Sequence, residues 1–337
     1  MDSNSSLPTE IWIDIIQLFG LPSQTSPYRL ERASIFALTR LCLVSHTFHV
    51  LAEPVLYSTA FITPNSSESF STAVTSPQSR ADGFPSGKFT KKGALVKSLA
   101  LADFGFPEAP HVQQIETILS AVGSSVLRLF IDTSRVDPTI ISASVCLDLD
   151  ATIQDALSIF SKIEELCLLH WDSYSLPLAS WPTLKRIVIA NSSLSTNLLA
   201  QLLRMKNLEL CILAWPISVQ SNSPPNFKFD LREVAQGDWG VSGEGRGAHN
   251  LAITVTKDFD LVVHLLARPS ETQNQSGNEE TRVKRPALML MDVPEVPGGL
   301  VDRNKKRDWT TRVVLDGTIW ERQREAWDAY VGRLYPS

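Results

Sequence analysis

The sequence predicts an α/β protein in which a short all-helical module at the amino terminus precedes an irregular β–α solenoid that ends in a capping helix. Three observations support this prediction. Apolar residues recur at helical spacing between residues 7 and 57. From residue 95 onward, short apolar strands alternate with helix-like segments. The last segment of the sequence is again amphipathic with helical spacing.

The composition is that of an ordinary globular protein. Of its 337 residues, 43% are hydrophobic and 20% charged, which is enough for one large or two modest domains. The net charge of −5 argues against a protein-wide surface for nucleic acid. No window approaches the roughly 18 apolar residues of a membrane span, and the polar start lacks a signal-peptide pattern. We therefore expect a cytoplasmic or nuclear protein with reduced cysteines, no membrane and no nucleic-acid partner.

The segment "LPTEIWIDIIQLFG" (7–20) predicts the first helix. Pro8 suits a first helical turn, Glu10 complements the helix dipole, and Gly20 is a suitable stop. A second apolar run, "ASIFALTRLCLVSHTFHVLAEPVLY", predicts one or two more helices that end at Pro54. A unit of about 50 residues is only marginally stable alone. Its surplus apolar surface must therefore be buried against the rest of the chain or against another protein.

These residues resemble the F-box, in particular the F-box of many fungal proteins. The resemblance rests on Leu-Pro-x-Glu-Ile at 7–11, on an Ile-Ile pair at 15–16, and on the block from residue 41 to 51 before a Leu-Tyr ending. The sequence departs from the family by about a dozen extra residues near 21–32, and by Phe48, where many members carry Trp. The resemblance implies docking onto the Skp-family adaptor of a cullin–RING ubiquitin ligase complex. The adaptor-binding residues that it implies are Leu7, Pro8, Glu10, Ile11, Ile15, Ile16, Leu41, Val44, Ser45, Phe48 and Leu51.

Residues 63–92 are rich in Ser, Thr, Pro and Gly, which predicts a linker or a long surface loop. We therefore expect the helical module over residues 1–62, this linker over 63–92, and a larger domain over 93–337.

Five short segments of the larger domain carry apolar residues at relative positions one, four and six. They begin at Val96, Val126, Ile163, Leu184 and Leu208, with helix-like stretches between them. This pattern predicts a β–α solenoid. It also resembles degenerate leucine-rich repeats, which F-box proteins often use to recognise their substrates. Because the spacing is uneven, a doubly wound parallel α/β sheet is the alternative.

In a solenoid, the third and fifth positions of each strand point to the inner face of the sheet. Here they form an apolar row flanked by Arg and Glu, which is suited to binding a target protein of unknown identity. The alternative is that both faces of the sheet are covered, as in parallel α/β folds. The candidate target-binding residues are Arg128, Phe130, Glu165, Cys167, Arg186, Val188 and Ile212.

The last third of the sequence offers three further features. The glycine-rich segment 239–250 lacks the Gly-Lys-Ser/Thr ending and precedes a strand, so phosphate binding is not expected. The basic run at 303–307 is expected to be a solvated loop, with a nuclear import signal or an anion patch as alternatives. The segment "GTIWERQREAWDAYVGRLYP" predicts a helix that seals the open end of the solenoid.

No pattern typical of catalysis or metal binding occurs. The six histidines form no His-x-x-x-His pair, the cysteines form no Cys-x-x-Cys group, and no Gly-x-Ser-x-Gly elbow is present. We expect no enzyme activity, no cofactor and no metal. The expected function is that of a substrate-recognition subunit of an SCF-type ligase, which binds the adaptor at one end and a target at the other. The alternative is an α/β scaffold or ligand-binding protein whose amino-terminal helices belong to its own core.

Overall fold

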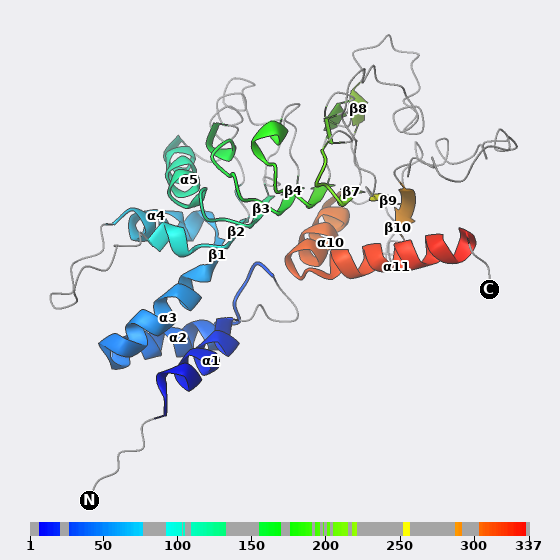
Figure 1. Cartoon of the computed structure of the whole chain (residues 1–337). Coiled ribbons are helices and arrows are strands. Elements are labelled where there is room, and N and C mark those ends of the chain that lie inside the picture. The colour runs from blue at the N-terminus through cyan, green and yellow to red at the C-terminus, as the bar shows by residue number, and fades with distance from the viewer. Residues whose placement is uncertain are drawn as a thin grey trace, which may run out of the picture.

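The chain folds into a group of three amino-terminal helices followed by a parallel β-sheet that has helices on both faces (Figure 1). The α/β class predicted from the sequence is therefore confirmed. The structure is a computed structural model, and it describes residues 7–20, 27–76, 92–102, 104, 109–132, 155–169, 176–190, 193–195, 198, 201–202, 205–214, 218–220, 252–256, 287–291 and 303–334.

The amino-terminal helices are α1 (Thr9–Gly20), α2 (Arg32–Val44) and α3 (His46–Ser58). Ser45 separates the second from the third, because its Oγ accepts a hydrogen bond from the backbone N–H of Phe48 at 3.3 Å and so caps α3. Pro54 lies inside α3, so the prediction that it ends the helix was wrong. The turn beyond Pro54 persists because Val55 and Leu56 pack against the small core of the three helices.

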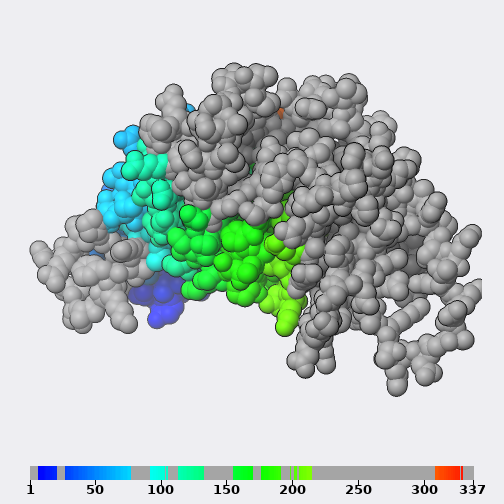
Figure 2. Space-filling model, turned by 90° about the horizontal axis from the view of Figure 1, so that it is seen from above, coloured from blue at the N-terminus to red at the C-terminus, as the bar shows by residue number. Residues whose placement is uncertain are grey.

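Eight strands form one parallel sheet, and their spatial order is the order of the sequence. Because this order never reverses among the described strands, the sheet differs from a doubly wound one. Figure 2 shows the same progression as a change of colour from blue to yellow-green across the molecule. The strands are β1 (Thr59–Ile62), β2 (Ser98–Leu101), β3 (Arg128–Asp132), β4 (Glu165–Leu169), β5 (Arg186–Ala190), β7 (Leu210–Ala214), β9 (Ala252–Thr256) and β10 (Ala287–Met291). A separate pair consists of β6 (Ser193–Ser195) and β8 (Ser218–Gln220).

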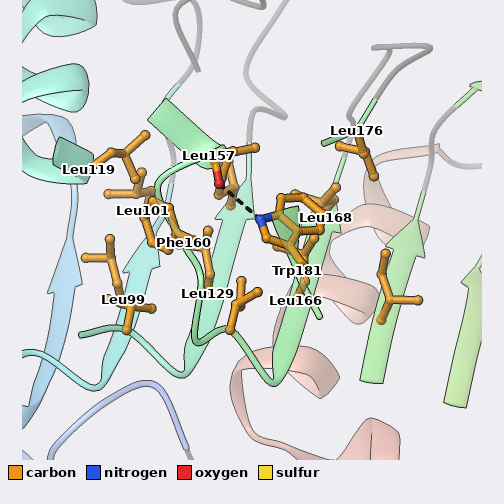
Figure 3. Close-up of a cluster of buried hydrophobic side chains, with 14 of the residues drawn as sticks. Leu99, Leu101, Leu119, Leu129, Leu157, Phe160, Leu166, Leu168, Leu176 and Trp181 are labelled. Carbon is orange, nitrogen blue, oxygen red and sulfur yellow. Dashed lines mark hydrogen bonds between the residues drawn. The ribbon is translucent and has the colours of Figure 1, made fainter. Parts of the chain in front are cut away.

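One face of the sheet packs against α4 (Pro64–Thr75), α5 (Ala109–Val122) and the turns between the strands. Figure 3 shows the leucines of successive strands side by side in this core. Trp181 lies among them, and its indole N–H donates a hydrogen bond to the carbonyl of Leu157 at 3.0 Å. The short helical turns η1 (Lys92–Leu95) and η2 (Leu178–Ser180) complete the connections.

The opposite face packs against α10 (Arg303–Leu315) and α11 (Thr318–Leu334), which form the lower layer in Figure 1. Thr311 of α10 donates a hydrogen bond to the buried carboxylate of Asp132 on β3 at 3.3 Å. Both faces of the sheet are therefore buried, which explains why its strands are apolar throughout.

The boundary between the helical module and the sheet lies at residue 58 and not at 62, because β1 pairs in register with β2. The predicted linker 63–92 also begins with a helix, α4. The backbone N–H of Thr63 donates to the Ser66 hydroxyl at 2.9 Å, and Pro64 occupies the first turn. Ser67 then hydrogen-bonds Gln114 of α5 at 2.5 Å. Of the linker, only residues 77–91 lie outside the described residues.

One prediction for the end of the chain was wrong, and a second was confirmed only in part. The basic run 303–307 begins helix α10 and is not a loop. The helix predicted over 317–336 is present as α11, but it covers the inner face of the sheet together with α10, as well as contacting the last strand. The glycine-rich segment 239–250 lies outside the described residues, as do residues 21–26 of the extra segment near 21–32.

Candidate functional site

The three amino-terminal helices share a very small core. Its fully buried members are Ile16, Leu30, Leu38 and Ala52. Trp12 of α1 meets Phe48 of α3 edge-on, with ring centroids 5.0 Å apart. This contact places the amino-terminal ends of α1 and α3 side by side. The end of α2 meets the start of α3 at Ser45, so the same end of the module also carries the α2–α3 junction.

This module exposes an unusual amount of apolar surface. Of the nine large apolar side chains that are exposed among the described residues, eight lie on it. Leu43 is 82% exposed and Val44 is 66% exposed at the α2–α3 junction, and Leu7 and Ile11 are exposed at the start of α1. Exposed apolar groups concentrated on one small unit are typical of a surface that another protein covers. The other exposed large apolar residues of the module are Leu18, Ile35, Phe36 and Val50.

The residues that the F-box resemblance implied divide into three groups by exposure. The exposed ones, which can contact a partner directly, are Leu7, Pro8, Glu10, Ile11, Val44 and Ser45. The half-buried ones are Ile15, Leu41, Phe48 and Leu51, of which the last three pack on the small core of the module. Ile16 is 1% exposed and belongs to the core. Its assignment as an adaptor-binding residue was therefore wrong, since it faces the other helices.

Sequence analysis missed Leu43 and Val50, two of the exposed apolar residues at this surface. In the apolar run that forms α2 and α3, both lie outside the stripe of apolar residues that marks the inward face of the helices. Their apolar character at outward positions is the signal that could have identified them, because solvent-facing positions of a helix are normally polar.

The loop between α1 and α2 attaches this module to the sheet. Tyr28 is completely buried on the inner face, where its hydroxyl donates to the Glu165 carboxylate of β4 at 2.6 Å. The same hydroxyl lies 3.4 Å from the sulfur of Cys167, and the ring packs on Phe130 at 5.7 Å between centroids. Part of the extra segment near residues 21–32 therefore anchors the module to the sheet.

A second set of contacts attaches the module to the sheet near the junction of α3 and β1. Glu53 of α3 forms an ion pair with Lys92 at 3.3 Å, and the Lys92 ammonium lies over the ring of Tyr57. The guanidinium of Arg29 lies over Phe61 of β1 at 5.0 Å. The module is thus held at one end of the sheet while its apolar residues remain exposed.

The predicted target-binding row does not form an open surface. Phe130, Cys167, Val188 and Ile212 do lie on the inner face, but all four are completely buried there. Helices α10 and α11 and the ring of Tyr28 cover them. This row was therefore wrongly assigned, and the alternative that both faces are covered is confirmed.

The charged residues of that row have different positions. Glu165 is 6% exposed and is held by Tyr28 and, at 3.8 Å, by Arg186. Arg186 also stacks over Trp320 of α11 at 5.6 Å, although its side chain is half exposed. Arg128 is exposed at the start of β3. Only Arg128 and Arg186 therefore remain accessible to a partner.

A groove of about 830 Å³ lies between the α1–α2 loop and α10. Three arginines and three acids face it together with several apolar residues. The groove is lined by Arg29, Leu30, Glu31, Arg32, Ile35, Phe61, Asp308, Thr311, Arg312, Leu315 and Asp316. Its mixture of opposite charges favours no particular class of small ligand.

Burial raises the pKa values of one tyrosine and of two cysteine thiols in the sheet domain. Burial, the nearby Cys167 and Glu165 raise the pKa of Tyr28 well above its ordinary value. Burial and the Glu165 charge likewise raise the pKa of Cys167, and burial alone raises that of Cys211 to about 12. Both thiols are therefore protonated at neutral pH and are poor nucleophiles.

Within the described ranges, no group of three or more His, Cys, Asp or Glu residues is placed to hold a metal ion. The described helices also include none with the length and apolar character needed to cross a membrane. In comparisons with known proteins, no protein-family model and no curated protein matched the chain.

Proposed function

We propose that this protein is a substrate-recognition subunit of an SCF-type ubiquitin ligase. The observation that carries the proposal is the concentration of exposed apolar side chains on the amino-terminal helices, above all Leu43, Val44, Leu7 and Ile11. A Skp-family adaptor would cover this surface and remove it from water, at roughly 25 cal/mol per Å² of apolar area. The F-box resemblance of the same residues supports the assignment of the partner.

In this proposal the chain performs no chemistry and needs no cofactor. The helical module binds the adaptor, and thereby the cullin complex, while the sheet domain binds a target protein. Tethering would raise the effective concentration of the target near the ubiquitin carrier, often into the millimolar range. The cytoplasm and the nucleus are the proposed locations. The attachments through Tyr28 and Glu53 support this role, because they hold the target-binding domain at a defined position relative to the module.

We infer that the sheet domain is a degenerate leucine-rich-repeat-like solenoid. The sequential order of its parallel strands supports this relationship. Its inner face is filled by its own helices, so the target would bind elsewhere on the domain.

The test is co-expression of the full chain with a Skp-family adaptor, followed by size-exclusion chromatography with mass determination. We expect a one-to-one complex that is lost on Leu43→Asp, because a buried unpaired charge costs several kcal/mol. Ile159→Asp is the matched control, since Ile159 is also an exposed apolar residue but lies on the sheet domain. A wild-type chain that remains monomeric beside the adaptor would refute the proposal.

The second candidate is a scaffold or ligand-binding protein whose amino-terminal helices belong to its own core. The insertion of Tyr28 into the inner face of the sheet favours it, since this residue joins the two parts into one body. The same experiment separates the two candidates. A scaffold does not bind the adaptor, so it forms no complex that Leu43→Asp could disrupt.

A further inference from the structure

The turns that lead into the strands place basic side chains along the amino-terminal edge of the sheet. In a parallel sheet these turns all lie at the same edge. The basic residues come from the turns before β2, β4, β5 and β7 and from the first positions of β3 and β5, and all of them are exposed to solvent. They are Lys97, Arg128, Lys162, Lys185, Arg186 and Lys206. We refer to this set as the basic edge.

Hydrogen bonds between neighbouring turns hold the basic edge in a fixed geometry. Thr183 donates its hydroxyl to the carbonyl of Ile163 at 2.8 Å, which joins the turns before β4 and β5. Asn207 donates its side-chain amide to the carbonyl of Pro182 at 2.5 Å, which joins the turns before β5 and β7. The turns that carry Lys162, Lys185 and Lys206 are therefore stacked in register, as their strands are.

Among the described residues, acidic groups compensate only part of these cations. Glu165 is buried, accepts from Tyr28 and pairs with Arg186 at 3.8 Å, and Glu164 pairs with Lys185 at 3.2 Å. Glu209 is exposed before β7. The basic edge therefore has an excess of positive charge although the whole chain has a net charge of −5. Such a local reversal of sign attracts partners of opposite charge.

We propose that the basic edge binds an extended acidic segment of a partner protein. Neighbouring strands lie about 4.8 Å apart, so the five turns from β2 to β7 span about 19 Å. An extended segment of about six residues covers that length. The three carboxylates that alternate along such a segment lie within the span of the exposed cations Lys97, Arg128, Lys162 and Lys206. Only the identification of this segment as part of a ligase target rests on the proposed function.

The pattern of the edge favours an acidic protein over a nucleic acid. Glu164 and Glu209 interrupt the row of cations, and they repel a phosphate backbone that carries a charge at every step. Among the described residues of the edge there is also no exposed aromatic ring on which a base can stack. A polypeptide with intermittent acidic residues fits both features.

The test uses the full chain and a fluorescein-labelled peptide in which glutamate alternates with serine. A peptide with glutamine in place of glutamate is the neutral control. Fluorescence anisotropy measures binding to the wild type, to the triple variant Arg128→Gln, Lys162→Gln, Lys206→Gln, and to the matched variant Arg32→Gln, Arg40→Gln, Arg324→Gln. The matched variant removes three exposed arginines of helices α2 and α11, none of which belongs to the basic edge.

We expect the acidic peptide to bind the wild type and the matched variant alike. The edge variant should bind about tenfold more weakly, from the sum of three modest exposed charge pairs. Binding should also weaken as salt increases. Equal binding of the neutral peptide, or equal loss in both triple variants, would overturn the proposal. So would tighter binding of single-stranded DNA, which would assign the edge to nucleic acid.

Adaptor co-elution separates this inference from the proposed function. The edge variant should still co-elute with the adaptor, because its substitutions lie outside the helical module. If the wild type fails to bind the adaptor but binds the acidic peptide through the edge, the ligase role is refuted and the basic edge stands. If it binds the adaptor and not the peptide, the ligase role stands and the basic edge is refuted.

Discussion

The hydroxyl of Tyr28 donates a hydrogen bond of 2.6 Å to the carboxylate of Glu165, across 137 positions of sequence. One residue belongs to the loop between the first two helices and the other to the first position of β4. Both are buried, so the carboxylate depends on this hydroxyl and on the more distant Arg186 for its stabilisation. The contact therefore joins the helical module to the sheet through a group that is costly to leave without a partner.

The first prediction concerns this hydroxyl. Tyr28→Phe keeps the ring that packs on Phe130 but removes the donor, and it should lower the free energy of unfolding by about 1–3 kcal/mol. Denaturation in urea measures the change. Tyr57→Phe is the control, because Tyr57 is half-buried beside Lys92, which already pairs with Glu53. Equal effects of the two substitutions would contradict the importance of the buried carboxylate.

The second prediction separates the core of the helical module from its exposed surface. Ile16→Ala should destabilise the protein by about 2–5 kcal/mol, because Ile16 fills the small core with Leu38 and Ala52. Ile11→Ala should change stability by less than about 0.5 kcal/mol, because Ile11 is 42% exposed.

If the proposed function is correct, the two substitutions have opposite profiles in a binding experiment. Ile11→Ala should weaken binding to a Skp-family adaptor at unchanged thermal stability. Ile16→Ala should lower the melting temperature, and it should affect the adaptor only to the extent that the module unfolds. Thermal melts and titration calorimetry on the same preparations measure both quantities. An Ile11→Ala protein with full affinity would remove α1 from the proposed interface.

The sheet could be predicted from the sequence because its signal is local. The apolar positions one, four and six mark each strand, and the strands at Arg128, Glu165 and Arg186 pair in the register that this pattern requires. The position of α10 and α11 could not be predicted in the same way. The start of α10 was expected to be a loop. The helical spacing of the α11 segment shows that one side is apolar, but it does not show which surface that side covers.

The helical module was likewise predicted only in part. The spacing of Ile11, Ile15 and Ile16 predicts a helix, but it could not separate the buried Ile16 from the exposed Ile11, because both lie on a broad apolar face. Tyr28 was not identified at all. A single loop residue gives no periodic signal, and its partner lies far away in the sequence.

The third prediction concerns alkaline pH. The unfolded thiol of Cys211 has an ordinary pKa of about 9, whereas burial raises the pKa of the folded thiol to about 12. Above pH 9 the unfolded chain therefore binds fewer protons than the folded chain, so the free energy of unfolding must fall as pH increases. The fall approaches roughly 1.4 kcal/mol per pH unit for each such group.

Cys167 and Tyr28 should add to this fall, because burial and neighbouring groups raise both pKa values as well. Urea denaturation between pH 8 and about pH 11 measures how steeply the free energy of unfolding falls with pH. A loss of packing in a variant lowers stability at every pH, so it does not change this slope. Cys211→Ala should reduce the slope by up to one proton's contribution, although it also lowers stability at pH 8. A slope that is unchanged in this variant would show that Cys211 does not titrate differently in the two states.

The fourth prediction concerns the turn between α10 and α11. Gly317 has a φ of +74°, a conformation that favours glycine, and a Cβ placed there would lie 2.9 Å from the Pro27 ring. Gly317→Ala should therefore cost about 1–2 kcal/mol from the backbone conformation alone, with a further loss from the contact with Pro27. That contact lies directly before Tyr28, so the turn supports the loop that attaches the helical module.

A double-mutant cycle with Pro27→Ala separates the two contributions. Removing the proline ring relieves the steric contact but leaves the backbone strain, so the double variant should be more stable than the sum of the single effects predicts. The difference is the coupling between the α10–α11 turn and the loop that carries Tyr28. Strict additivity in urea denaturation would show that Gly317 acts through its backbone conformation only, and that the loop does not depend on this turn.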